Sequence, residues 1–558
     1  MTTDRVEPGR FHSAVTARDL LTLIVVIVGL LVVTGLPYLF AYASAPPEKQ
    51  FMGILLDVPD TAQYLSWARE SSRALLIENK LTAERGDPMF FNLFWLSVGR
   101  LARALGLGLA EAMQLVRPLA GAVYLGAVYW FITLMGGNRL HRWVSFLIIA
   151  CGGGLGWVLV VLKQGTGELA FPLDVYVMEA NTFLTVMAFP LQAISGGLLV
   201  LALGVSLLAF ERNNLSLAIV AGLLSLVLGL QHGYDLLIIY AVLGAVALTL
   251  AFRQRPDLRP IGLYTVVCAL SLPALAYLVY ITRESPIFRA VLSQYGNAGV
   301  YTPPLIHLPV LMGLPLLTIL VSPAQPSEGQ RGDPREVLLA CWLVVGFLLL
   351  YIPTDFQIKM LSGWQVPVGI LSTRVLLSHI APAISKVGRV ARGRPDLVLG
   401  ILFVLAVLPV NVYLYLWRFV DLARHDYPYY LHHDEIAAMR WLEANSQPSD
   451  VVLSSLTIGQ YLPSVSGNTA FLAHWAQTLD FYRKMDMVAS FFDPASSEQD
   501  RLNLIQRFGV SYIFHGHQEE ALGGYDPSQS PYLRKVYSSA RASLYRVQET
   551  VQGVGVNR

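Results

Sequence analysis

Long apolar stretches recur along this chain from residue 20 to residue 417, and they restrict its fold more than any other feature. A membrane-spanning helix needs roughly 20 mostly apolar residues. Stretches of this kind lie near residues 20–43, 114–136, 143–162, 186–210, 215–231, 233–252, 260–281, 304–322, 337–353, 364–384 and 397–417. Only 14% of the residues are charged, whereas soluble proteins carry about a quarter. We therefore predict a polytopic α-helical membrane protein with about eleven transmembrane helices.

Several classes of function have no support in the sequence. The three cysteines, Cys151, Cys268 and Cys341, lie inside apolar runs, so we expect neither a disulfide framework nor a CxxC metal site. The chain has no P-loop, GxGxxG, GxSxG or HExxH motif, and no nucleic-acid-binding module. We therefore expect no nucleic-acid partner and no chemistry driven by a cytoplasmic nucleotide.

The distribution of basic residues predicts the orientation of the chain. Short cytoplasmic loops of membrane proteins retain Lys and Arg. With a cytoplasmic N-terminus, the segments on that side hold Arg5, Arg10, Arg18, Arg139, Arg142, Arg212, Arg253, Arg255, Arg259, Arg331, Arg335, Lys386, Arg389, Arg392 and Arg394. The short outer loops hold only Lys163, Arg283, Arg289 and Lys359. This alternation predicts that residues 44–115 and everything after Trp417 lie outside.

The first outer loop, residues 44–115, is far longer than a simple connection. Within it, Leu65 and Ala68 share one helical face with Ser72, Leu75 and Leu76. A second run, 89–105, is rich in aromatic residues but is interrupted by two arginines. Both patterns are typical of helices that lie in the membrane interface. We therefore predict a membrane domain, 1–417, whose first outer loop contains interfacial helices.

After Trp417 the composition becomes that of a soluble domain. The segments VVLSS, TAFLAHW, VSYIFHG, LRKVYSS and ASLYRV read as short strands, with helices near 477–492 and 496–507 between them. Asp434 is placed to cap the helix EIAAMRWLEAN. We predict that residues 418–558 form a small α/β domain outside the cytoplasm.

Asp57 and Asp60 are the candidate catalytic residues, because they follow the first span directly in the predicted outer loop. An accessible carboxylate held by rigid neighbours can act as a general base. Pro59 lies between the two and favours a turn followed by the start of a helix, in which Asp60 would be the N-cap of TAQYLSWA. Catalysis and capping are therefore alternative roles for Asp60. One or two carboxylates do not define a metal-coordination shell, so a divalent metal is neither required nor excluded.

Other polar residues at the predicted outer side are candidates for binding. Ionisable groups in or beside a membrane are costly unless they are used or paired. Arg117, Arg374 and Lys359 suit a phosphate group, although the two arginines would also reach lipid head groups. The remaining candidates are Glu179, His232, Asp235, Gln357 and His474. For His232 with Asp235 the alternative is a pair that stabilises a turn, and for His474 it is a buried structural histidine.

With these residues identified, the chain resembles the GT-C superfamily of integral-membrane glycosyltransferases, and in particular bacterial members related to protein O-mannosyltransferases. Four stretches carry the resemblance. They are LDVPDTAQYLSW, LQHGYDL, DFQIKMLSGWQVPVGIL, and the C-terminal EIAAMRWLEAN with IGQYLPSVSGNTAFLAHW and RFGVSYIFHG. Together these stretches cover most of the chain, although each motif is loose.

The resemblance implies an activity that the composition alone does not. Such enzymes transfer a sugar, with inversion, from a polyprenyl-phosphate-linked donor to an acceptor outside the cytoplasm, here a glycan, lipid or protein. A first-loop aspartate acts as base, and Asp60 with its neighbour Asp57 matches that position. Many members have adjacent acidic residues in this loop, whereas here two residues separate them. The implied location is the bacterial cytoplasmic (inner) membrane.

Two other functions remain as alternatives. A transporter or flippase for a lipid-linked glycan would carry charges at mid-membrane and often shows repeated halves, and we find no such repeat. An outer domain that binds a glycan or protein, beside an inert membrane part, is the other alternative.

Overall fold

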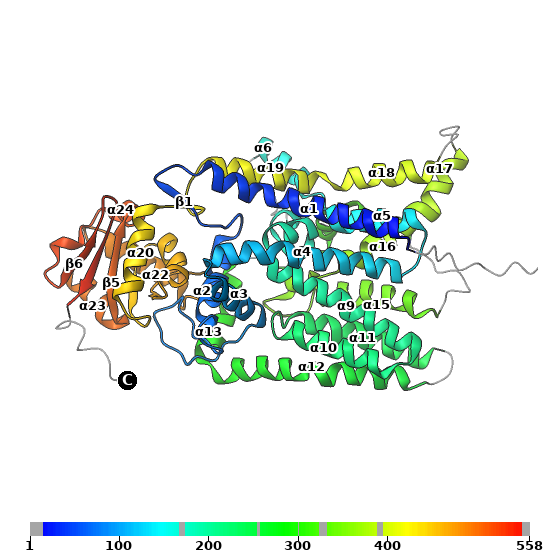
Figure 1. Cartoon of the computed structure of the whole chain (residues 1–558), viewed down its shortest axis with the longest axis horizontal. Helices are drawn as coiled ribbons and strands as arrows, with labels where there is room; N and C mark the ends of the chain where they lie inside the picture. Colours follow the sequence, from blue (N-terminus) through cyan, green and yellow to red (C-terminus); the bar gives the residue numbers. More distant parts are fainter. Residues whose placement is uncertain are drawn as a thin grey trace, which may run out of the picture. The chain divides into compact units, whose positions relative to one another are not determined.

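The computed structural model describes residues 15–166, 173–253, 257–298, 301–322, 332–387 and 394–548 (Figure 1). Several basic residues used to predict the orientation lie outside the described residues. They are Arg5, Arg10, Arg255, Arg331, Arg389 and Arg392. The chain forms two compact units. Unit 1 is Met1–Gly35, Arg117–Leu275 and Tyr301–Trp417, and unit 2 is Leu36–Val116, Ala276–Val300 and Arg418–Arg558.

Unit 1 is helical, and its helices follow the apolar stretches of the sequence. They are α1 (Ala17–Ser44) and α4 (Leu109–Leu134) in part, α5 (Arg139–Cys151), α6 (Gly156–Thr166), α7 (Leu173–Tyr176), α8 (Thr182–Ala188), α9 (Pro190–Arg212), α10 (Leu215–Gly229), α11 (Asp235–Phe252), most of α12 (Arg259–Glu284), α14 (Leu308–Val321), α15 (Pro334–Leu349), α16 (Gln365–Val375), α17 (Ala381–Val387), α18 (Pro395–Val407) and part of α19 (Pro409–Ala423). Helix α9 packs against α8, α10, α11 and α15.

The chain is a multi-pass helical protein. The lengths and apolar composition of its helices support fewer membrane spans than the sequence predicts. Each of the eleven predicted stretches contains helix. Among the described residues, six helices are long and apolar enough to cross a membrane, or up to eight if each of two bent pairs is one span. Helices α10, α14 and α15 have 15, 14 and 16 residues, or about 21–24 Å against a hydrocarbon core of about 30 Å. The count of eleven stays a prediction.

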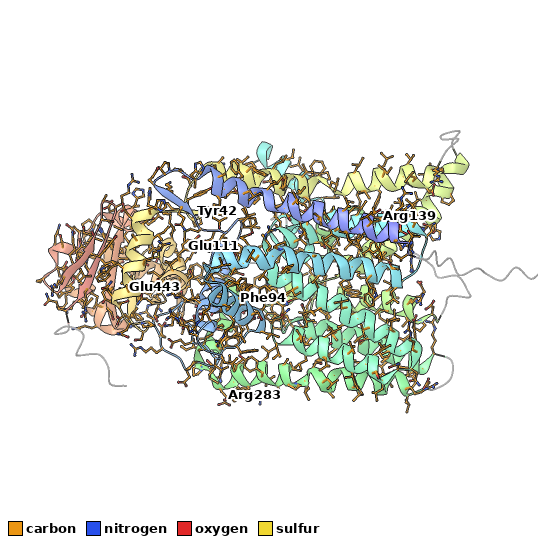
Figure 2. The ribbon with its side chains drawn as sticks, viewed as in Figure 1. Tyr42, Phe94, Glu111, Arg139, Arg283 and Glu443 are labelled. Atoms are coloured by element: carbon orange, nitrogen blue, oxygen red, sulfur yellow. The ribbon has the colours of Figure 1, made fainter. Side chains whose placement is uncertain are left out.

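Two ion pairs join the ends of four helices at one end of unit 1. Arg139, at the start of α5 and labelled in Figure 2, lies 2.7 Å from the carboxylate of Asp19 at the start of α1. Arg335, at the start of α15, lies 2.7 Å from Glu211 at the end of α9. All these helix ends belong to the side predicted to be cytoplasmic. The contacts agree with the predicted alternation of loops, while the side of the membrane stays a prediction.

Unit 2 contains a five-stranded mixed sheet with strand order β4-β3-β5-β7-β6. The strands are β3 (Val451–Leu453), β4 (Thr469–Ala470), β5 (Val510–Gly516), β6 (Leu533–Ser538) and β7 (Ala542–Val547), which lie where the sequence predicts them. β3 pairs in parallel with β4 and β5, whereas β7 is antiparallel to β5 and β6. The accompanying helices are α20 (His433–Asn445), α21 (Leu456–Val465), α22 (Phe481–Phe492), α23 (Glu498–Phe508) and α24 (His517–Gly523).

The predicted cap of α20 is wrong. Asp434 lies in the first turn, and the N-cap position is His432. The backbone N–H of His432 donates to the Glu435 carboxylate at 2.9 Å, which forms one half of a capping box. The acidic residue three positions after the cap therefore marks this helix start.

The first loop is built into unit 2 together with the C-terminal sequence. Strand β1 (Lys49–Phe51) pairs antiparallel with β2 (Tyr430–His432). Helix α2 (Val58–Ser71) buries Leu65 and Ala68 and packs against α3 (Leu93–Leu105) and α21. Leu75 and Leu76 lie beyond the end of α2 and are exposed. The apolar face that suggested an interfacial helix therefore packs partly against protein. The domain boundary at residue 417 stays a prediction.

Close packing of α3 on α2 depends on Gly99. A Cβ atom at this position would lie 2.0 Å from the backbone oxygen of Ala68. We expect Gly99→Ala to destabilise the protein by about 1–3 kcal/mol, because the two helices must separate. The measurement is the melting temperature of the purified protein. Gly29→Ala is the control, because a Cβ at Gly29 meets nothing within 4 Å. An equal melting temperature for both variants would contradict this account of the packing.

Candidate functional site

Asp60 is a hydrogen-bond acceptor at the start of α2, not the cap of that helix. The helix begins at Val58, which puts Asp60 in its first turn and Asp57 at the N-cap position. The Oδ1 atom of Asp60 accepts hydrogen bonds from His474 Nε2 at 2.9 Å and from Trp475 Nε1 at 3.2 Å. The Asp60 side chain keeps 16% of its surface exposed. The capping alternative for Asp60 is therefore wrong, and the carboxylate is both held and accessible.

Asp57, the N-cap residue of α2, has a left-handed backbone conformation. Its φ of 50° and ψ of 63° lie in the left-handed region, and its side chain makes no capping hydrogen bond. Aspartate tolerates this region better than most residues. The two aspartates predicted as a pair therefore have different surroundings: Asp57 lies in the left-handed region, whereas the Asp60 carboxylate accepts from His474 and Trp475.

The hydrogen bonds of His474 determine which of its ring nitrogens carries the proton. Its Nδ1 atom accepts from the backbone N–H groups of Ala476 and Gln477, at 3.0 and 3.2 Å. A neutral imidazole has one donor nitrogen and one acceptor nitrogen, so Nε2 carries the hydrogen and donates it to Asp60. His474 is also 2% exposed. The prediction of a buried histidine is confirmed, and this histidine orients a candidate catalytic carboxylate.

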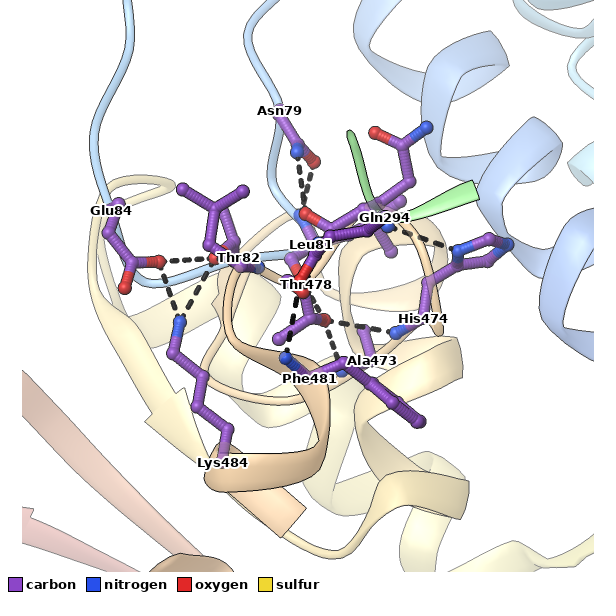
Figure 3. A network of polar contacts seen from close by, with 12 residues as sticks. Asn79, Leu81, Thr82, Glu84, Gln294, Ala473, His474, Thr478, Phe481 and Lys484 are labelled. Atoms are coloured by element: carbon purple, nitrogen blue, oxygen red, sulfur yellow. Dashed lines mark hydrogen bonds and ion pairs between the residues drawn. The ribbon is translucent and has the colours of Figure 1, made fainter. Parts of the chain in front are cut away.

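Thr478 holds the loop that carries His474. Its hydroxyl oxygen accepts from the backbone N–H groups of Ala473 and His474, both at 3.0 Å, and donates to the backbone oxygen of Leu81 at 2.5 Å (Figure 3). The first loop and the segment after β4 are thus joined by one side chain. Thr478 was not singled out in the sequence, because its partners are distant along the chain.

Lys484 extends the same network, as Figure 3 shows. Its ammonium group donates to Glu84 at 2.6 Å and to Thr82 at 3.0 Å. The side chain also lies over the rings of Phe471 and Phe508. Burial lowers the pKa of Lys484, and the charge of Glu84 opposes that shift. The network fixes residues 79–84 of the first loop against α22.

A second polar cluster lies in unit 1, beside a small cavity of about 20 Å³. Lys359 donates to the Glu179 carboxylate at 2.7 Å. Gln365 donates to Tyr124 at 3.0 Å and to Thr182 at 3.2 Å. Polar and ionisable groups inside an otherwise apolar bundle are costly unless they are paired or used, so this cluster is a second candidate site.

His232 and Asp235 belong to this second cluster. His232 Nδ1 lies 3.0 Å from Asp235 Oδ2, and both side chains are buried at the edge of the cavity. Burial lowers the pKa of His232, but the Asp235 carboxylate more than offsets this, so the pKa is raised. The structure thus brings together Glu179, Lys359, His232 and Asp235 from the predicted set. It adds Tyr124, Ser195 and Gln192, whose only sequence signal was a polar group inside an apolar run.

Arg374 does not join this cluster. Its guanidinium contacts both carboxylate oxygens of Glu336, at 2.7 and 2.8 Å, and the backbone oxygen of Met135. Glu336 lies in the first turn of α15, whereas Lys359 follows the end of that helix. Sixteen helical residues, about 24 Å, separate those ends. The two residues predicted to bind one phosphate are therefore at opposite ends of α15.

The remaining predicted residues have structural positions of their own. Arg117 is 5% exposed within α4, and a Cβ at Gly35 of α1 would lie 3.5 Å from its Nη2 atom. Gln357 is half-buried at the start of the 3-10 turn Gln357–Leu361 that carries Lys359. Among the described residues, no group of three or more His, Cys, Asp or Glu is arranged to hold a metal ion.

Comparison with known proteins gives fold neighbours only. No protein-family model matches the sequence, and no curated protein matches it. The archaeal oligosaccharyltransferase AglB from Archaeoglobus fulgidus, solved with an inhibitory peptide and a dolichol-phosphate, has a TM-score of 0.57 and 12% identity, over 97% of this chain and 76% of that chain. Arabinofuranosyltransferase AftD from Mycobacteria has a TM-score of 0.57 and 14% identity over 97% of this chain, which spans 40% of AftD.

A third neighbour matches along nearly its whole length. ArnT from Cupriavidus metallidurans, bound to undecaprenyl phosphate, has a TM-score of 0.50 and 14% identity, over 95% of this chain and 99% of that chain. At these identities the comparison establishes the fold alone.

Thr478 provides a test of how the His474 loop is held. We expect Thr478→Val to destabilise the protein by about 2–4 kcal/mol, because two buried N–H groups lose their acceptor. Thr478→Ser, which keeps the hydroxyl, is the control. The measurements are the melting temperature and the hydrogen-exchange rate of amides 473–479. Unchanged exchange in Thr478→Val would show that the hydroxyl does not hold this loop.

Proposed function

We propose that this chain, which has the fold of the GT-C integral-membrane glycosyltransferases, transfers a sugar from a polyprenyl-phosphate-linked donor to an acceptor with inversion. The observation that carries the proposal is the accessible Asp60 carboxylate, held by His474 and Trp475. The dolichol-phosphate bound to AglB and the undecaprenyl phosphate bound to ArnT support the class of donor.

Asp60 would act as the general base. In the proposed step the acceptor hydroxyl loses its proton to the Asp60 carboxylate, and its oxygen forms a bond to the anomeric carbon of the sugar. The bond from that carbon to the phosphate oxygen breaks, and polyprenyl phosphate leaves with its electron pair. A carboxylate positioned within hydrogen-bonding reach of the acceptor is what this step requires.

His474 would position Asp60 without relaying its proton. A relay would require Nδ1 to carry a hydrogen, but Nδ1 faces two backbone N–H donors from Ala476 and Gln477. Both His474 and Trp475 donate to the same oxygen, Oδ1 of Asp60. These two donors fix the plane of the carboxylate and stabilise its charged form.

Lys359 would bind the phosphate of the donor. The three predicted basic residues are Arg117, Arg374 and Lys359. Lys359 contacts Glu179, and Glu179 lines the polar cavity of unit 1. An ammonium group is a compact charge that suits a phosphate oxygen and a departing phosphate. The Glu179 carboxylate fixes the position of that charge.

The cellular setting is part of the same proposal. The apolar helices support a multi-pass membrane protein. We propose a cytoplasmic N-terminus and an extracytoplasmic domain 418–558 because basic residues alternate along the chain. The family resemblance of the sequence implies a bacterial inner membrane and a relation to protein O-mannosyltransferases, and both belong to the proposal. The acceptor is a glycan, a lipid or a protein.

Substitution of Asp60 tests the assignment of the base. We expect Asp60→Asn to lower kcat about 10²–10⁴-fold, the range of a lost general base, and Asp57→Asn to lower it by less than about tenfold. The measurement is sugar transfer from a polyprenyl-phosphate donor by purified protein in detergent. Asp434→Asn, a half-buried carboxylate in the first turn of α20, is the control. Full activity in Asp60→Asn would refute the assignment, and a larger loss in Asp57→Asn would reverse it.

A matched pair of substitutions tests the phosphate-binding residue. We expect Lys359→Gln to raise the KM for the donor roughly 10- to 100-fold, as for a lost charge-assisted hydrogen bond. Arg374→Gln, which breaks the ion pair with Glu336, should lower the melting temperature and leave the donor KM within about twofold. The opposite pattern of KM values would assign the phosphate to Arg374.

A further inference from the structure

Four leucines of unit 2 are exposed where helices α2 and α3 end. Leu75 and Leu76 follow the end of α2 and are 59% and 45% exposed, and Leu105 and Leu107 lie at the end of α3 and are 56% and 38% exposed. We call these four residues the leucine tip. A single exposed leucine is normal on a protein surface, whereas a group of them marks contact with another molecule or with a membrane.

The two helices run parallel, which brings their ends together. The rings of Tyr64 and Trp95 are stacked with centroids 4.9 Å apart, and farther along both helices Arg103 donates to the backbone oxygen of Ser72 at 3.2 Å. Gly106, with a φ of 65°, ends α3 in the left-handed conformation that helix ends favour. The residues that follow α2 and those that follow α3 therefore lie at the same end of the pair.

Other apolar residues of the pair are covered by protein. Helix α2 buries Leu65 and Ala68, and α3 buries Val98. The chain becomes buried again directly after Leu76, because Ile77 is 3% exposed and pairs with Phe90. The leucine tip is thus a local feature, and the described residues leave it uncovered.

Three exposed arginines accompany the leucine tip, namely Arg73, Arg100 and Arg103. None of them lies within ion-pair distance of a carboxylate in the part of the chain that the structure describes. The first turn of α4 adds one acidic residue, Glu111. Arg103 also suits the negative end of the α3 dipole, but the dipole accounts for neither Arg100 nor the leucines. Apolar side chains beside an excess of positive charge suit the surface of a bilayer that contains anionic lipids.

Chain connectivity places the leucine tip near lipid. Helix α4, a candidate membrane span, begins at Leu109, two residues after Leu107. It has 26 residues, or about 39 Å, against a hydrocarbon core of about 30 Å. If α4 spans the bilayer, Leu109 is then within about 9 Å of the hydrocarbon. Exposed Leu115, Leu119 and Val123 recur at every fourth position of α4, as on a lipid-facing side.

We infer that the leucine tip enters the head-group region of the bilayer and that Arg73, Arg100 and Arg103 bind the phosphates of anionic lipids there. The contact is made through the ends of α2 and α3, whereas the sequence predicted helices that lie in the interface. A second copy of the chain is a poorer occupant, because a two-fold interface would bring the same arginines together. The inference is independent of the proposed sugar transfer.

A fluorescent probe on the full-length protein tests the membrane contact. The three native cysteines are first replaced in Cys151→Ala, Cys268→Ala and Cys341→Ala. Leu107→Cys is then labelled with NBD in phosphatidylcholine nanodiscs, and we expect doxyl lipid to quench the probe and aqueous iodide not to reach it. Ser490→Cys, at an exposed position of α22, is the control and should show the reverse. Leu75→Cys is a second probe position, used if the first variant does not fold.

The class of lipid is tested with the same probe. Doxyl phosphatidylglycerol and doxyl phosphatidylcholine are each added as a minor component, and we expect the anionic lipid to quench at least about twofold more strongly. The triple variant Arg73→Gln, Arg100→Gln, Arg103→Gln should lose this preference. A control that removes the same charge from exposed positions of α20, α22 and β6 should keep it, and it consists of Arg440→Gln, Arg483→Gln and Arg534→Gln.

Four results would overturn the inference. Iodide quenching of the probe without lipid quenching would place the leucine tip in water. Protection of the probe from both quenchers would show that protein, such as a second copy, covers it. Equal quenching by the two lipids, or the same lipid preference in both triple variants, would show that the three arginines do not bind anionic lipid.

Discussion

The hydrogen bond between Asp60 and His474 joins two parts of the chain that are 414 residues apart. Its geometry depends on both partners being fixed beforehand. Asp60 is fixed by the start of α2 and by the packing of α2 on α3 and α21. His474 is fixed by Thr478 and by two backbone N–H groups. The first loop and the C-terminal sequence must therefore fold together before the carboxylate can have its observed surroundings.

The periodic features of the fold were predictable from the sequence. Apolar runs marked the helices, and alternation with turn residues marked the five strands of unit 2. Helix starts were harder, because several polar residues compete for the N-cap. At α20 the capping box of His432 and Glu435 prevailed over Asp434. At α2 the proline in the first turn places the helix start before Asp60, a signal that the sequence contained.

The candidate site was predictable only in part, because its contacts are non-local. Position after the first span was enough to select Asp60, but nothing near Asp60 in the sequence indicates His474 or Trp475 as partners. Arg374 shows the opposite case. Its place in an apolar run suggested a phosphate ligand, yet Glu336, 38 residues earlier, already binds its guanidinium. An ionisable residue in such a run has a partner, and only the three-dimensional structure identifies which.

We propose that this membrane protein cleaves a lipid-linked sugar rather than transporting it. The direct measurement follows a polyprenyl-phosphate-linked sugar in liposomes containing the purified protein, with mass spectrometry of the lipid products. We predict that free polyprenyl phosphate forms together with a glycosylated acceptor, and only when acceptor is present. Movement of the intact donor across the bilayer, with no polyprenyl phosphate released, would contradict it and favour a flippase.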